Sequence, residues 1–129
     1  MKVEKIMEEQ RFQVLVKTLQ EQEGIEEIFL LNKGGEVAYK SADFQLSNEE
    51  AGALLTAWKT KEPAIMFQNY RFAVLKNDEI QLAARNISGG KGNIVGSVTK
   101  EGEYLVAHTR DEGLIILEWS IFINKVAWS

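Results

Sequence analysis

The sequence predicts an α/β (α+β) fold: a central six-stranded antiparallel sheet with the N- and C-terminal helices on one face and a third helix on the other. Three observations predict it. The first half of the chain holds two amphipathic helical stripes, a glycine-containing turn joins two strands between them, and four short strands follow in series. Helices on both faces would bury strands that are apolar on both sides. The 129 residues fit a single domain, 1–129.

Apolar residues at the spacing i, i+3, i+4, i+7 predict the first two helices, because this spacing places them on one helical stripe. The first helix lies within residues 3–20, and Gly24 is a natural stop after it. The second helix follows Ser47 and ends before Pro63, which cannot continue a helix. The stripes are Phe12, Leu15, Val16 and Leu19 in the first helix, and Ala51, Leu54, Leu55 and Trp58 in the second.

Turn residues and a helix-capping pair predict the remaining elements of the first half of the chain. Ile25–Leu31 is a short apolar run typical of a buried strand, and Glu36–Ser41 returns beside it after the turn 32–35. Ser47 and Glu50 are spaced as a capping box, in which the serine hydroxyl accepts from the Glu50 amide and the Glu50 carboxylate accepts from the Ser47 amide. We therefore expect a hairpin followed by a well-capped helix.

Four short strands are predicted in the second half, and the short loops between them favour an antiparallel meander. Their ranges are Tyr70–Lys76, Ile80–Arg85, Asn93–Thr99 and Tyr104–Thr109. The segment 114–117 is compatible with a strand, since a short apolar run does not reveal its period. A helical face shared by Ile115, Trp119, Phe122 and Val126 favours a C-terminal helix instead. The acidic pair Asp111-Glu112 would suit its N-terminus.

Composition and charge exclude several classes of function. The chain has no cysteine, which removes disulfides and cysteine-containing metal sites and fits a reducing cytoplasm. Its N-terminus lacks the apolar core of a signal peptide, and its longest apolar run, interrupted by Glu118, is too short to span a membrane. The net charge is −4, all of it in residues 1–64, so nucleic acid is not an expected partner.

No catalytic constellation is recognisable, so we expect a binding protein and not an enzyme. The single histidine, His108, has no cysteine or second histidine to join it in a metal site. The loop 88–92 lacks the glycine spacing and the following helix of a phosphate loop, and we interpret it as a strand connection. Adjacent carboxylates such as Glu26-Glu27 do not face each other, which makes them solvated charges. We expect no metal and no cofactor.

The order of elements and several local motifs resemble the profilin family. Residues 35–41 are similar to the family's G-x-x-W-A-x-S strand, and Ser47–Glu50 to its S/T-x-E-E helix start. Tyr70–Asn77 is similar to the central K-Y-x-V-I-R strand. Residues 82–109, with Arg85, the glycine loop and a V-T-K strand end at 98–100, resemble its basic strand, Gly-Gly loop and last strands. The resemblance spans nearly the whole chain and depends on the order and spacing of loose motifs.

The resemblance implies a protein that binds monomeric actin and regulates its polymerisation. In this family the actin surface is formed by the central strands of the second half and the start of the C-terminal helix. The matching positions are Arg71, Val74, Lys76, Arg85, Asn93, Val95 and Glu112. Charged side chains on otherwise neutral strands suit such a surface, because charges at a rim steer partners. The resemblance also implies a cytoplasmic, cytoskeletal monomer.

Further ligands of the family are proline-rich peptides and anionic phosphoinositide lipids. Ala38 stands where the family has the strand tryptophan, and the N-terminal helix offers Phe12 in place of the family's tryptophan and tyrosine. A polyproline groove would therefore depend on Phe12, Trp119, Phe122 and Trp128. The other reading of Trp119 and Trp128 is that they pack into the core against the N-terminal helix.

Two other functions are compatible with parts of this pattern. A roadblock or longin-like scaffold, which dimerises and regulates a small GTPase, shares the early helix–hairpin–helix order, but three strands typically follow instead of four. A small-molecule sensor would need a ligand cavity that a sequence cannot show. The four-strand second half favours profilin.

Overall fold

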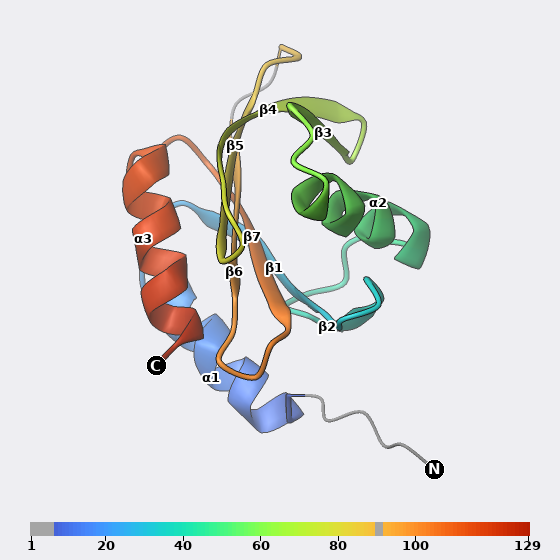
Figure 1. Cartoon of the computed structure of the whole chain (residues 1–129). Coiled ribbons are helices and arrows are strands. Elements are labelled where there is room, and N and C mark those ends of the chain that lie inside the picture. The colour runs from blue at the N-terminus through green and yellow to red at the C-terminus, as the bar shows by residue number, and fades with distance from the viewer. Residues whose placement is uncertain (1–6, 90–91) are drawn as a thin grey trace.

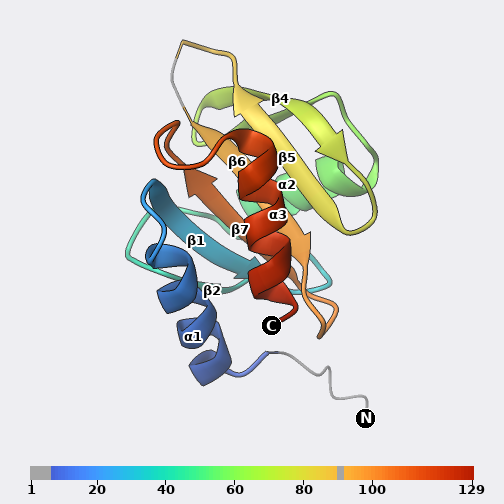
Figure 2. The ribbon, with the colours of Figure 1, turned by 90° about the vertical axis from the view of Figure 1, so that its left-hand side faces the viewer.

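A computed structural model describes residues 7–89 and 92–129, which form one antiparallel sheet between helices (Figure 1). The helices are α1 (Glu9–Gln20), α2 (Asn48–Lys59) and α3 (Ile116–Ala127). The strands are β1 (Ile25–Leu31), β2 (Val37–Lys40), β3 (Ala64–Phe67), β4 (Tyr70–Asn77), β5 (Gln81–Asn86), β6 (Asn93–Val98) and β7 (Tyr104–Thr109). The sheet order is β2-β1-β7-β6-β5-β4-β3. Helices α1 and α3 lie on one face and α2 on the other, as predicted (Figure 2).

In the described part of the chain the sheet has seven strands, so the prediction of six was one short. The missed strand, β3, has four residues and pairs with β4 through a two-residue turn, Gln68-Asn69, whose φ angles are 50° and 69°. Both turn residues adopt the left-handed region without a glycine, and therefore carried no hairpin signal. The turn is held from outside, because the Glu50 carboxylate accepts the Gln68 amide at 2.5 Å.

That contact corrects the predicted capping box at α2. The Ser47 hydroxyl does accept from the Glu50 amide, at 3.0 Å, as the spacing predicted. The Glu50 carboxylate bonds to Gln68 instead of returning to the Ser47 amide. One half of the motif thus caps the helix, while the other half fixes the turn between β3 and β4.

The first core cluster lies between the sheet and the pair α1 and α3. The predicted stripe of α1 is buried in full, and Trp119 of α3 joins it with no exposed surface. Arg11 of α1 connects the C-terminal end of α3 to the β6–β7 turn, because its guanidinium donates to Glu101 and to the carbonyl oxygens of Ala127 and Ser129. The C-terminal segment is thus helical, and α1 and α3 pack together.

The second cluster lies under α2, where Trp58 anchors the helix to the sheet. The Trp58 indole Nε1 donates to the Asp78 carbonyl oxygen at 3.1 Å, and its ring lies edge-on to Tyr104. A glycine faces this ring: a Cβ on Gly96 of β6 would come within 2.9 Å of the Trp58 ring. The glycine therefore permits α2 to approach the sheet closely.

Helix α3 begins later than the acidic pair predicted at its N-terminus. Asp111 and Glu112 lie in the loop between β7 and α3, before the N-cap residue Ile115. The carboxylate that serves the helix start is Glu118, which accepts the Ile115 amide at 3.2 Å. Gly113 allows this loop to pass close to the segment between α1 and β1, because a Cβ at position 113 would lie 2.1 Å from the Glu23 carbonyl oxygen.

Candidate functional site

One part of the sheet is left uncovered by the helices. Helix α3 packs over β5, β6 and β7, while β4 lies beyond it (Figure 2) and β3 is the edge strand next to β4. Ala83 of β5 packs into the core under α3, so Arg85, two residues on, points to the same face. Arg85 pairs with Ala73 of β4, and Met66 of β3 pairs with Arg71, which extends this face to the edge of the sheet. We call this surface, with the adjoining flank of α3, the open face.

Three cationic side chains lie on the open face: Arg71, Lys76 and Arg85. Strict alternation along β4 would put Arg71 and Lys76 on opposite faces. A register shift between Val74 and Lys76 makes a bulge at Leu75, so that Lys76 pairs with Ala83 and turns to the side of the arginines. Within the described ranges, none of the three cations has a carboxylate at ion-pair distance. They are therefore free to meet a negatively charged partner.

Exposed apolar side chains accompany the cations. Met66 and Ile87 lie on the strand side of the open face, and Ile87 continues the pairing of β5 by donating its amide to the Arg71 carbonyl at 2.8 Å. Leu117 and Ile121, the latter 62% exposed, form a stripe one turn apart on α3. The sequence prediction missed these four residues. The available signal was a C-terminal helix apolar on most sides, which leaves one flank without a core to cover it.

The other four predicted actin positions do not all reach the surface. Asn93 and Val95 lie on the correct face of the sheet, but beneath α3 and the preceding loop, with exposures of 2% and 0%. Their side chains cannot contact a partner, and Asn93 instead donates to the Thr109 hydroxyl at 3.1 Å. Val74 faces the α2 side and packs against its core. Glu112 is exposed in the β7–α3 loop, 3.9 Å from Arg110.

The four aromatic residues predicted to form a polyproline groove do not line one surface. Phe12 and Trp119 are fully buried, and Phe12 stacks on Tyr39. Phe122 is half-buried against Trp119, while Trp128 lies on the other flank of α3, beside the β4–β5 turn. The prediction of a shared groove is therefore wrong, because the aromatic side chains that α1 and α3 direct toward each other form core contacts.

The remaining sequence candidates have structural partners. The Nδ1 atom of His108 lies 3.2 Å from a Glu27 carboxylate oxygen, and its ring contacts Phe67 and Phe72. In the loop 88–92, residues 90 and 91 lie outside the described part, and Ser88 accepts the Arg71 amide at 2.8 Å. Across the described residues, no group of three or more histidine, cysteine or acidic side chains could hold a metal ion. No helix in residues 7–89 and 92–129 has both the length and the apolar character needed to cross a membrane.

Comparisons with solved structures define the class of the fold. The structure resembles LokiProfilin1 in its complex with rabbit actin, with a TM-score of 0.78, 16% identity and coverage of 95% of both chains. It also resembles LokiProfilin2 in complex with rabbit actin (TM-score 0.73, 16% identity, 92% and 96% coverage). Acanthamoeba castellanii profilin IA matches at a TM-score of 0.62, with 13% identity and 79% and 80% coverage. The fold is that of the profilins.

Sequence relatives then show the family. Loki profilin-3 of Lokiarchaeum sp. (strain GC14_75) is 69% identical over 123 residues, which cover 95% of this chain and all of the relative. Odin profilin of Odinarchaeota yellowstonii (strain LCB_4) is 30% identical over 79 residues, 61% of this chain and 63% of that protein. No protein-family model matches the sequence. The chain belongs to the profilin family, which confirms the resemblance and does not favour the roadblock or longin alternative.

Proposed function

We propose that this chain binds monomeric actin through the open face and regulates its polymerisation. The observation that carries the proposal is the combination, on one uncovered surface, of four exposed apolar side chains with three cations that form no ion pair within the described residues. Two relatives of the same fold occur in complexes with rabbit actin. The protein acts by binding and not by catalysis, as a cytoplasmic monomer. Binding of an anionic phosphoinositide lipid stays a prediction.

The chemistry of the open face specifies its partner surface. Apolar side chains at the centre of an interface supply most of the affinity, while charges accelerate association and select the partner. Arg71, Lys76 and Arg85 require acidic groups on actin, and the side chains of Ile87 and Ile121 require apolar ones. The association rate should therefore fall as salt is added, while the dissociation rate changes less.

The test is a titration of rabbit actin and of an archaeal actin with the purified protein, following binding, nucleation and elongation. Arg85→Glu should weaken binding about tenfold or more without lowering the melting temperature, because Arg85 is exposed and has no ion-pair partner among the described residues. Lys100→Glu, the same charge reversal in the β6–β7 turn, should leave binding unchanged. The proposal is refuted if neither actin binds at saturating protein, or if both variants lose the same affinity.

A further inference from the structure

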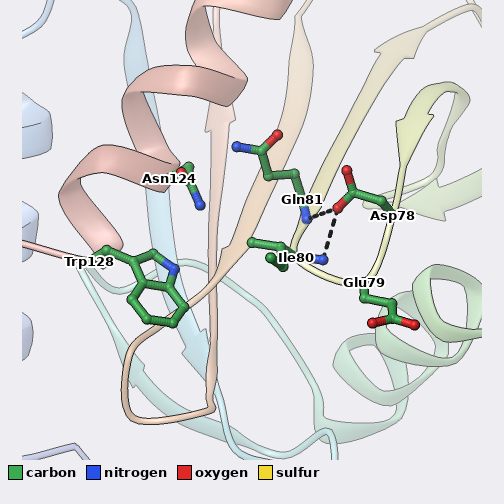
Figure 3. A pocket seen from close by; sticks show the side chains of 6 residues that line it. All are labelled: Asp78, Glu79, Ile80, Gln81, Asn124 and Trp128. Atoms are coloured by element: carbon green, nitrogen blue, oxygen red, sulfur yellow. Dashed lines mark hydrogen bonds between the residues drawn. The ribbon is translucent and has the colours of Figure 1, made fainter.

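A concave surface opens between the β4–β5 turn and the C-terminal end of α3 (Figure 3). Its volume is about 580 Å³. The lining residues are Asp78, Glu79, Ile80, Gln81, Asn124 and Trp128. None of them belongs to the set of positions matched to the actin surface. We call this surface the turn hollow. It adjoins the open face, since Gln81 lies on the same side of β5 as Ala83 and Arg85.

The turn that forms one wall is rigid. The Asp78 carboxylate accepts the amides of Ile80 at 2.8 Å and Gln81 at 2.7 Å. The Asp78 carbonyl oxygen also accepts the buried indole N–H of Trp58, which ties the turn to α2 across the sheet. Glu79 and Ile80 therefore project from a fixed backbone, and a ligand would not need to order the turn.

The opposite wall is the side chain of Trp128. Trp58 and Trp119 are 3% and 0% exposed, whereas Trp128 is 50% exposed. Its backbone is fixed at the end of α3, where its amide donates to the Asn124 carbonyl oxygen at 3.2 Å. Figure 3 shows its indole directed toward Ile80, which is itself half-exposed. An accessible indole beside an aliphatic side chain is a surface on which an apolar or a flat cationic group can pack.

Charge at the turn hollow selects a cation. The Glu79 carboxylate forms no hydrogen bond or ion pair with any residue in the described ranges. Burial opposes ionisation of Asp78, but the amides of Gln81 and Ile80, with Lys76 and Lys61 nearby, outweigh it and lower the pKa of its carboxyl. The C-terminal end of α3 adds partial negative charge. Because two lysines already lie near the turn, the site suits one cationic group and not a polybasic tract.

We propose that the turn hollow binds a single arginine side chain on an extended peptide segment of a partner protein. A guanidinium stacks flat on the indole of Trp128, while its aliphatic stem contacts Ile80. Its N–H groups reach the amide oxygens at the rim, on Gln81 and Asn124. The Glu79 carboxylate, which Figure 3 shows directed away from Trp128, attracts the cation at longer range. The Asn124 amide nitrogen is already engaged with the Ser97 hydroxyl at 3.0 Å, which leaves its oxygen for the ligand.

The experiment is a titration followed by ¹⁵N–¹H NMR with short peptides that differ at one central residue. The chain has three tryptophans, so its spectrum contains three indole signals, and Trp128→Phe identifies the relevant one. A Gly-Ser peptide with one arginine should shift the Trp128 indole signal saturably, and a lysine peptide should bind more weakly. Peptides with glutamine at that position, and a polyproline peptide, should not shift it. Saturable shifts with glutamine or with polyproline overturn the proposal.

Substitutions separate the site from a general effect of charge. Calorimetry with the arginine peptide should show about a tenfold loss of affinity for Trp128→Ala and a several-fold loss for Glu79→Gln. Glu49→Gln, the same charge change at an exposed position on α2, should have no effect. Equal losses in Glu79→Gln and Glu49→Gln refute the site. Actin binding by Glu79→Gln is measured in parallel, so that failure here is distinguishable from failure of the actin proposal.

Discussion

The close approach of α2 to the sheet makes Gly96→Ala a sensitive substitution. A Cβ on Gly96 would lie 2.9 Å from one Trp58 ring carbon, 3.0 Å from another and 3.3 Å from the Leu105 carbonyl oxygen. The Trp58 ring cannot move freely, because Tyr104 lies edge-on to it and its Nε1 is bonded to Asp78. One added methyl group in a filled core costs about 2 kcal/mol. For a chain of this size, that lowers the melting temperature by about 8 °C.

The assay is thermal and urea unfolding of a double-mutant cycle. If the ring contact causes the loss, Gly96→Ala should cost at least about 1 kcal/mol less in a Trp58→Phe background, since the smaller ring leaves room. Gly52→Ala is the matched control: its Cβ would meet nothing closer than 3.9 Å, and alanine in a helix should stabilise by about 0.5–1 kcal/mol. The reasoning is refuted if Gly96→Ala is as stable as the natural chain, or if its cost is the same in both backgrounds.

Three further predictions concern the loop before α3, the ion pair between Arg11 and Glu101, and the open face. Gly113→Ala should lower the melting temperature by several degrees, because φ is +89° and the Cβ would collide with the Glu23 carbonyl oxygen; unchanged stability would contradict this. Burial opposes ionisation of Glu101, but hydrogen bonding from Arg11 outweighs it and lowers its pKa. The resulting stabilisation, about 1 kcal/mol, is present above the unfolded pKa and lost as pH falls through the folded one. Unfolding at pH 7 and pH 3 should therefore show that Glu101→Gln destabilises the chain more at pH 7 than at pH 3. Ile121→Lys should weaken actin binding about tenfold without loss of stability, and unaltered affinity would exclude α3 from the interface.

The elements that the sequence predicted correctly are those with a strong period. The stripe of α1 that includes Phe12 and the stripe of α2 that includes Trp58 are buried as expected, since each helix must cover its apolar face. Strand β3 was missed because four residues show little alternation and Gln68-Asn69 is not a typical hairpin turn. Its geometry depends on the Glu50 carboxylate, a contact between segments that local patterns do not encode.

The open face was predictable in part. The family resemblance selected Arg71 and Arg85, and the structure places both on the uncovered surface. Asn93 and Val95 show the limit of this reasoning. Alternation along a strand tells which face a side chain takes, but coverage of that face depends on where α3 crosses the sheet. The same crossing determines that Ile121 is exposed while Trp119 is buried.

The bulge at Leu75 accommodates one extra residue in β4. Removing Leu75 would restore strict alternation without moving its neighbours, because Lys76 would follow Val74 directly and still pair with Ala83. If Leu75 stayed and the strand became regular, the Lys76 amine would turn toward the layer beneath α2, and Asn77 would leave its bond to the Trp58 carbonyl oxygen. A deletion of Leu75 should therefore leave Lys76 on the open face. The bulge absorbs the extra residue and so keeps Lys76 on the same side of the sheet as the two arginines.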